Sequence, residues 1–564
     1  MIWCLQSDVT VRPILAFRFD NWVTVVFTLV IAIWSMFMLD VWTRTLRTYQ
    51  TRWGLDSKFE SNHRTRGKFR GNKTLHPRPI RQLGWESLEA RFLDAAHTAA
   101  GSPEREIQYD SLGLTLKRCV AVFLPLVTMT AMLVIVYVAI TVFRVFARIK
   151  LSADHDSDLI GSLLASLTAS LLNLIFILAL NDVYYIVAIK LTDWENHRTQ
   201  SGHEDALIWR VFWFQFVNTN AALFYVAVIK PSYESIRCSS GEIIPENPWP
   251  EPCASYGCRL ELSLELMVIM VGKQWLQNKK EAYYPKLETW WTNYRAKSKD
   301  KEAAAYEDLE GPMLPWEEDF RNLAAIPEMD TFEDFLELAL QFGFCTMYVS
   351  AFTLAPMFAL WNNVTEKRVD SEKMLRSYRR AVPFYGSGIG VWEDILKTIS
   401  IVGIIMQGLV LACTSELVPM IIFQGYFHNV TYPLTGNWPD GQYGGEATYI
   451  SASYHYNYDH QCSKKSLCKP PINDPNGDIK YTEYAYYLLV GRLILFLAFE
   501  HTVFILKLLV NSFLPGMPKS LRRHKEIQNM VIEKVLKAEA TTEERQSISL
   551  EGRKVGRKLV ATTV

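Results

Sequence analysis

Long apolar segments recur along the chain and alternate with charged stretches. About nine of them are long enough to cross a hydrocarbon core of ~30 Å, which requires roughly 20 residues of α-helix. They lie near residues 19–43, 117–146, 159–190, 206–230, 258–285, 332–353, 355–378, 393–423 and 482–514. The pattern predicts an all-α fold, that of a polytopic helical membrane protein with about nine transmembrane helices.

The composition agrees with this prediction and excludes several other classes. Of the 564 residues, 49% are hydrophobic and 13% are aromatic. The formal net charge is zero, so the distribution of charge along the chain says more than its sum. The sequence has no nucleotide-binding glycine loop, no internal repeat and no hydrolytic motif. We therefore expect neither an enzyme nor a nucleic-acid partner.

Lysine and arginine are unevenly distributed among the loops, and this distribution predicts the orientation of the chain in the membrane. Base-rich segments are expected in the cytosol, and segments poorer in bases are expected outside. The expected cytosolic segments are 44–116, 286–330 and the tail 515–564, and the expected outer segments are 1–18, 231–257 and 424–481. Residues 19–514 then form one transmembrane domain, with the linker 286–330 partly helical.

The segments expected outside contain residues that are modified on that side of a membrane. They hold Cys4, Cys238, Cys253, Cys258, Cys462 and Cys468. Disulfides persist in this oxidising environment, although spacing does not determine which cysteines pair. The sequon "NVT" begins at Asn429, which predicts a glycoprotein.

Four acidic residues interrupt two neighbouring apolar segments. The stretch "DTFEDFLELALQFGF" places Asp334 and Glu337 three residues apart, and "ALWNNVTEKRVDSEKM" places Glu366 and Asp370 four residues apart. Each spacing puts both acids on one helix face. The short connection "AFTLAP" makes the two segments an antiparallel hairpin, so the pairs can meet at similar depth. A single such acid would merely mark a helix end, but two pairs in phase favour a cation site.

The segment at 258–285 adds ligands from a third side. Asn278 and Glu281 lie at its inner end, and Gly272 precedes them. A glycine inside a span is a plausible bend point, with close helix packing as the alternative. Several carboxylates with an amide suit Ca²⁺ better than Mg²⁺, which keeps more of its water. The sequence therefore predicts a Ca²⁺ site.

Several motifs together resemble the anoctamin family. They are "FDNWVTVVF", "FVNTNAALFYVAVIK", "GKQWLQN", "LELALQFGF", "LAPMFALWNNVTEKRVD", "GIGVW" and "LPGMPK", and they occur in the family's order from Phe19 to about Lys519. The resemblance implies a dimeric protein whose members have ten spans. It also implies a Ca²⁺-activated chloride channel, a Ca²⁺-activated phospholipid scramblase, or both.

The resemblance also implies which residues bind Ca²⁺. The family's ligands correspond to Asn278, Asp334, Glu337, Glu366 and Asp370. Aspartate at 334 stands where glutamate is usual, which keeps the charge.

The sequence departs from the family pattern in two ways. The family's remaining acid lies four residues after the asparagine, where this chain has Ala282. Glu281 is one residue early, so we expect it to bind only if the helix is locally re-wound. The family's cytosolic N-terminal domain and first span have no counterpart, which suggests either a chain that begins so or a shortened product.

The resemblance implies a permeation groove. Its expected lining includes Asn181 and Gln215, although hydrogen bonding between helices explains each amide equally well. Lys273, beside the Gly272 bend, is the candidate for meeting an anion. Bound Ca²⁺ would cancel the negative field of the four acids at the inner mouth and draw the inner end of the 258–285 segment inward.

Three functions remain open from the sequence. The family resemblance favours a Ca²⁺-activated chloride channel, gated by Ca²⁺ bound between the 258–285, 332–353 and 355–378 segments. Gln215 stands where chloride-conducting members have a lysine, which leaves a phospholipid scramblase as the alternative. A non-conducting tether or regulatory subunit is less consistent with buried carboxylates. We expect chloride or other anions and membrane phospholipids as partners, a homodimer, and the plasma membrane or the endoplasmic reticulum.

The predicted orientation can be tested directly. Epitope tags at Ser61 and at the C-terminus should be reached by antibody only after permeabilisation, and Asn429→Gln should remove one glycan. A tag at Ser61 that antibodies reach on intact cells would contradict the whole orientation.

Overall fold

The computed structural model describes a large part of the chain. The described residues are 22–53, 66, 69, 73–75, 106–108, 111–154, 158–232, 258–299, 316, 323–324, 330–380, 388–415, 417–419, 421–422, 483–513, 518, 521–523, 525–531 and 533–534. Cys258 is disulfide-bonded, as expected for an outer cysteine. Asn429, Ser61 and the other five outer cysteines lie outside the described residues.

Each of the nine apolar segments coincides with a helix or with helical elements joined end to end. The elements are α2 (Trp22–Arg52), α4 (Ser111–Asp154), α5 (Asp158–Trp194), α6 (Gln200–Phe224), η4 (Tyr225–Ile229), α8 (Cys258–Val268), η5 (Ile269–Lys273), α9 (Gln274–Lys299), α12 (Asp330–Met347), α13 (Ala355–Glu372), η6 (Lys373–Ser377), α14 (Trp392–Thr414) and α17 (Glu483–Phe513). The elements labelled η are π-helical turns that continue the helix before them. Two short strands, β1 (Lys73–Leu75) and β2 (Glu106–Gln108), pair antiparallel. The prediction of a polytopic helical membrane protein is confirmed.

Six helices in the described part of the chain are long and apolar enough to cross a membrane by themselves. They are Trp22–Arg52, Val127–Ala147, Leu163–Trp194, Gln200–Ser232, Trp392–Thr414 and Tyr486–Val510. The other three predicted segments also form helices, namely α8–η5–α9, α12 with the turns after it, and α13–η6. These three carry the charged residues singled out above, which lowers their apolar character.

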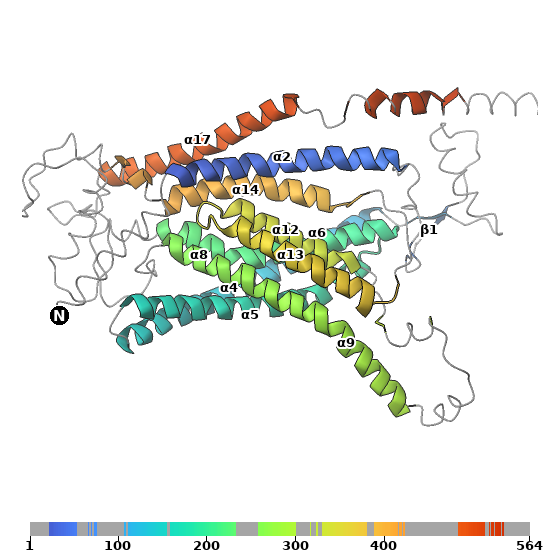
Figure 1. Ribbon diagram of the computed structural model, residues 1–564. Helices are drawn as coiled ribbons and strands as arrows, with labels where there is room; N and C mark the ends of the chain where they lie inside the picture. Colours follow the sequence, from blue (N-terminus) through green and yellow to red (C-terminus); the bar gives the residue numbers. More distant parts are fainter. Residues whose placement is uncertain are drawn as a thin grey trace, which may run out of the picture.

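The helices form a layered bundle (Figure 1). α17 and α2 lie on one side, α4 and α5 lie on the opposite side, and α6, α8, α12 and α13 lie between them. α14 packs against α12, α2 and α17. The main core is formed by buried side chains of α5, α6, α8, α12 and α14, such as Phe212, Leu266 and Tyr348. α9 continues well past the bundle to Lys299, so the predicted linker 286–330 begins as helix.

Small residues on α14 allow its neighbours to approach closely. A Cβ atom added at Gly403 would lie 3.1 Å from Oγ1 and 3.2 Å from Cβ of Thr346 on α12. The hydroxyl oxygens of Ser400 and of Ser35 on α2 lie 3.3 Å apart. Small residues are typical of helix interfaces in membranes, where packing rather than the hydrophobic effect holds helices together. α14 is therefore the helix around which α2 and α12 are arranged.

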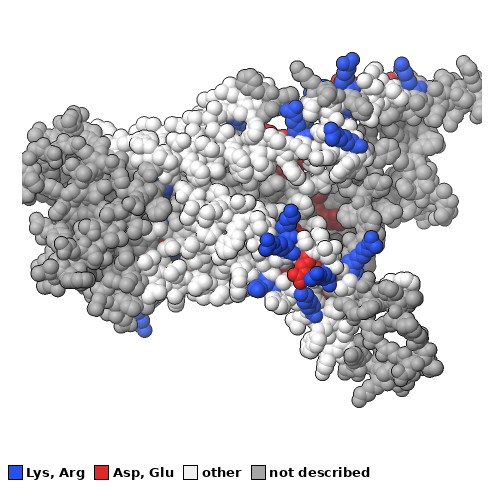
Figure 2. All heavy atoms as spheres, viewed as in Figure 1, with Lys and Arg blue, Asp and Glu red and all other residues white. Residues whose placement is uncertain are grey.

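The described surface is apolar along the bundle and charged at one end. Figure 2 shows a mostly neutral flank, with Lys and Arg side chains gathered at the end toward which α9 extends. Large apolar side chains on α17, such as Leu489, Ile494 and Leu508, are more than half exposed. An apolar surface of this kind is stable against lipid tails, in agreement with a membrane-spanning bundle.

The close contact at Gly403 makes a packing prediction. Gly403→Leu should lower the thermal unfolding midpoint of the purified protein, because overpacking a tight interface costs about 1–3 kcal/mol. The matched control is Gly113→Leu on α4, where an added Cβ meets no atom within 4 Å. Equal unfolding midpoints for the two variants would contradict a tight α12–α14 interface.

Candidate metal centre

Five acidic side chains from three helices converge at one place. Asp334 and Glu337 come from α12, Glu366 and Asp370 from α13, and Glu281 from α9. Oxygens of Glu281, Asp334 and Asp370 lie within 4.8 Å of one another, and so do oxygens of Glu281, Glu337 and Glu366. The structure thus brings together the two acid pairs expected from the sequence, and Glu281 belongs to both triplets.

These carboxylates are shielded from solvent and poorly compensated. The exposed fraction is 4% for Glu337 and 8% for both Glu281 and Glu366. Asn362 donates a hydrogen bond of 3.3 Å to Oε1 of Glu337. Neither oxygen of Glu366, nor Oε2 of Glu337, has a hydrogen-bond partner among the described residues. A buried charge is costly unless it is paired. Glu337 and Glu366 must therefore be stabilised either by a bound cation or by protonation.

Asn278 completes an all-oxygen donor set. Its side-chain oxygen is shielded and has no hydrogen-bond partner in the described part of the chain. It precedes Glu281 by three residues on α9, so both side chains belong to one helix face. Carboxylate and amide oxygens are the ligands that Ca²⁺ prefers. The residues therefore fit a Ca²⁺ site.

A π-helical turn lies between α8 and α9. It spans Ile269–Lys273 and includes Gly272, where an added Cβ would lie 2.6 Å from Cδ2 of Leu174 on α5. Gly272 thus lies at an irregular turn and also in a close helix contact, so both sequence interpretations hold. A π turn accommodates one extra residue and rotates the helix after it. The turn precedes both Asn278 and Glu281, so it does not change the register between them, yet Glu281 lies within the cluster.

Lys373 also belongs to the cluster, although the sequence analysis did not predict it as a site residue. Its Nζ atom lies 2.9 Å from Oδ1 of Asp334, 3.4 Å from Oε2 of Glu281 and 3.6 Å from Oδ1 of Asp370. The side chain is only 6% exposed. The sequence feature that could have indicated Lys373 is its position three residues after Asp370, which puts both side chains on the same face of the α13–η6 helix.

The residues predicted to line a permeation groove are buried or half-buried in the bundle. Asn181 on α5 accepts a hydrogen bond of 2.9 Å from Asn218 on α6, and both side chains are buried. Lys273 is 6% exposed, and its main electrostatic partners are Glu337 and Glu333. Gln215 on α6 is half-buried. At Asn181 the structure favours helix-to-helix hydrogen bonding, the alternative interpretation from the sequence.

A second buried charge network lies toward the other end of α8. Oε1 of Glu261 is 2.6 Å from Nζ of Lys230 and 3.3 Å from Nη1 of Arg144. Asn173 donates a hydrogen bond of 3.3 Å to Glu265 on the same helix. This network joins α4, α5, α8 and the helical residues that follow η4. Both of its bases pair with Glu261, so this acid is compensated by charges from neighbouring helices.

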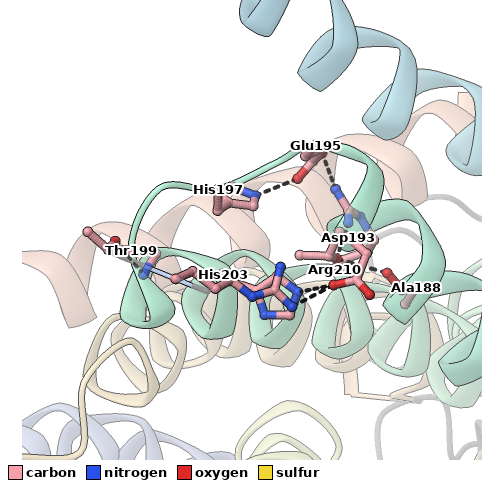
Figure 3. A network of polar contacts seen from close by, with 10 residues as sticks. Ala188, Asp193, Glu195, His197, Thr199, His203 and Arg210 are labelled. Carbon is pink, nitrogen blue, oxygen red and sulfur yellow. Dashed lines mark hydrogen bonds and ion pairs between the residues drawn. The ribbon is translucent and has the colours of Figure 1, made fainter. Parts of the chain in front are cut away.

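A third polar network joins the ends of α5 and α6 at their connecting loop (Figure 3). His197 lies 2.7 Å from Glu195, and Asp193 accepts from His203 at 3.0 Å. Burial alone would raise the pKa of Glu195, but hydrogen bonds from His197 and Arg210 outweigh it and lower that pKa below its ordinary value. Glu195 is therefore a stable anion that holds the loop, and no ion is needed here either.

Comparison with known proteins agrees with the cluster. Residues 1–528 match a family model described as "Anoctamin: Calcium-activated chloride channel". The chain is 32% identical to anoctamin-7 of Homo sapiens over 507 residues, which is 89% of this chain and 50% of that protein. It is 30% identical to anoctamin-5 of Homo sapiens over 536 residues, or 92% of this chain and 55% of that protein.

A third relative extends the match along the chain. Anoctamin-4 of Mus musculus is 28% identical over 571 residues, which covers 98% of this chain and 56% of that protein. The chain spans about half the length of the curated relatives it matches. The fold, the buried acids on three neighbouring helices and the family match lead to one conclusion: the chain belongs to the anoctamin family.

Proposed function

We propose that the chain forms a Ca²⁺-activated anion channel of the anoctamin type. The observation that carries the proposal is the carboxylate pair Glu337 and Glu366, which is buried within a cluster of five acids and has three of its four oxygens without a hydrogen-bond partner among the described residues. Such a cluster is a poor device for stability, because replacing buried charges by apolar residues is often stabilising. Its retention across three helices favours a role in binding a cation.

Six residues would hold Ca²⁺ in this proposal. They are Asn278, Glu281, Asp334, Glu337, Glu366 and Asp370. When bound, the cation supplies positive charge that offsets the repulsion among the acids. The chain's own contribution is to hold α9, α12 and α13 at a distance where their acids meet. Because α9 bears Glu281 beyond the η5 turn, neutralising the acids favours a position of α9 close to α12 and α13.

A second candidate is Ca²⁺-activated scrambling of phospholipids. The observation that favours it is the burial of Lys273, which keeps the expected basic residue of the groove against acids. An anion pathway requires basic groups along its wall, whereas a lipid pathway requires a neutral polar seam. Asn181 and Asn218 provide neutral polar groups between α5 and α6.

The surroundings of the protein are part of the proposal. We place the protein in the plasma membrane, with the endoplasmic reticulum as the alternative, and propose a homodimer that carries glycans at Asn429. Chloride or other anions and membrane phospholipids are its proposed partners. We propose neither enzymatic activity nor a nucleic-acid partner.

One experiment tests both candidate functions. The purified chain is reconstituted in liposomes, and chloride efflux and fluorescent-lipid scrambling are measured on the same sample across Ca²⁺ concentrations. Efflux without scrambling supports the channel, and scrambling without efflux supports the scramblase. If neither activity depends on Ca²⁺, the proposal is wrong.

The acids on α13 should control this Ca²⁺ response. Glu366→Gln and Asp370→Asn should each raise the half-activating Ca²⁺ concentration at least ~10-fold, or about 1.4 kcal/mol of binding free energy, because each removes a charged ligand. The matched control is Glu372→Gln, which changes a solvent-exposed acid of α13 that lies 3.4 Å from Lys286 of α9. Dose–response curves that coincide for wild type and both ligand variants would contradict the proposal that these acids bind Ca²⁺.

Glu281 should matter as much as the family-matched ligands. Because its carboxylate belongs to both triplets, Glu281→Gln should weaken Ca²⁺ activation by a factor similar to that of Glu366→Gln, about 10-fold or more. Glu288→Gln, at an exposed position on the same helix, is the control. A small effect of Glu281→Gln, equal to that of the control, would mean that Glu281 is not a ligand.

A further inference from the structure

Lys373 places a positive charge inside the acidic cluster. It is the first residue of the π-helical turn η6, which continues α13. Its ammonium lies within 3.6 Å of carboxylate oxygens from α9, α12 and α13. Among the described residues, no other lysine or arginine forms an ion pair with Glu281, Asp334, Glu337 or Glu366.

The lysine forms ion pairs with the acids of one half of the cluster and, among the described residues, with neither Glu337 nor Glu366 of the other half. Its three partners, Glu281, Asp334 and Asp370, are the first of the two carboxylate triplets. In the described part of the chain it forms no ion pair with Glu337 or Glu366, and three of the four oxygens of these two carboxylates also lack hydrogen-bond partners there. The two halves share Glu281, but the ammonium group of Lys373 lies among the carboxylates of only one of them.

An ammonium and Ca²⁺ cannot both occupy the first triplet. Both bind carboxylate oxygens, and the lysine Nζ lies among the same oxygens that a metal ion would need. Two cations a few ångströms apart repel each other. A cation attached to the site by its own side chain also has a high effective concentration. Ca²⁺ can fill this half only when the lysine side chain leaves it.

We propose that Lys373 is a tethered counter-cation that competes with Ca²⁺ for the Glu281–Asp334–Asp370 half of the cluster. The Glu337–Glu366 half then binds Ca²⁺ first, and the lysine sets the Ca²⁺ concentration at which the first triplet fills. This inference rests on the proposed function, because it concerns the regulation of the same site.

The alternative is that Lys373 acts only as a structural pin, meaning that its ion pairs hold α13, α9 and α12 together and have no part in Ca²⁺ binding. The two roles predict opposite changes when the charge is removed. A competitor that is removed lets Ca²⁺ bind more tightly, whereas loss of a pin loosens the ligand geometry and weakens Ca²⁺ binding. Both roles predict lower stability without Ca²⁺, so the direction of the change in affinity is decisive.

Equilibrium dialysis with radioactive Ca²⁺ on the purified full chain measures that direction. Lys373→Gln should tighten the weaker Ca²⁺ binding step at least ~10-fold, because the repulsion between a unit charge and a divalent cation roughly 4 Å away is stronger in a protein than in water. The control is Lys286→Gln, an exposed lysine 3.4 Å from Glu372, for which screening should keep the change below about twofold. Unchanged or weaker Ca²⁺ binding by Lys373→Gln would overturn the inference.

A second measurement, of thermal unfolding with and without Ca²⁺, tests the inference even if the Lys373→Gln variant folds poorly. Five acids without the lysine repel more strongly, so the rise in thermal unfolding midpoint on adding Ca²⁺ should be larger for Lys373→Gln than for wild type. A variant that is recovered folded only in Ca²⁺ also supports the inference. A variant that Ca²⁺ stabilises less than wild type, or that is recovered in neither condition, shows a structural pin and overturns it.

Glu366→Gln in the same dialysis separates this inference from the proposed function. If wild type and Glu366→Gln bind Ca²⁺ equally, the Ca²⁺ site itself is wrong and the inference falls with it. If Glu366→Gln weakens binding while Lys373→Gln leaves it unchanged, the site stands and only the competition by Lys373 is wrong.

Discussion

Mutual repulsion among five carboxylates is the constraint on which the rest of this structure depends. Two unit charges about 4 Å apart near a protein surface interact by roughly 4 kcal/mol, and the cluster holds several such pairs. Lys373 offsets part of this repulsion, and Asn362 contributes one hydrogen bond to Glu337. The remainder must be met by a cation or by protons. Three helices that carry charge into an apolar bundle can stay together only because other helices supply the packing.

The six apolar helices and the residues on α14 supply that packing. Gly403 and Ser400 bring α12 and α2 against α14, so that α12 is held from behind while its acids face α13 and α9. Glu261 is paired with Lys230 and Arg144 on neighbouring helices, and Glu195 is paired with His197 and Arg210. In both networks a buried acid is paired with bases from the same or a neighbouring helix. The acidic cluster differs from them because five acids share one paired lysine, and our proposal of a Ca²⁺ site rests on this difference.

Local patterns were enough to predict the helices and part of the site. Apolar segments of sufficient length become helices wherever they lie, because backbone hydrogen bonds must be satisfied within the segment in a membrane. The spacing of Asp334 from Glu337, and of Glu366 from Asp370, settles which helix face each pair shares. The hairpin between α12 and α13 then brings the pairs together, so these four acids could be assigned from the sequence.

The tertiary structure decided what depends on rotation and contact between distant segments. The η5 turn precedes α9, and hydrogen-bond geometry rather than composition distinguishes a π turn from regular helix. The contacts of Lys373 with the acids of α9 and α12 exist only because these helices lie beside the α13–η6 helix. Lys273 and Asn181 looked like groove residues, yet neighbouring helices bury both. By itself the sequence determined the nine helices, the two acid pairs and the family resemblance, because these are set by periodicity and order along one chain. The partners of each charge were decided only by the tertiary structure, because they come from helices far apart in the sequence.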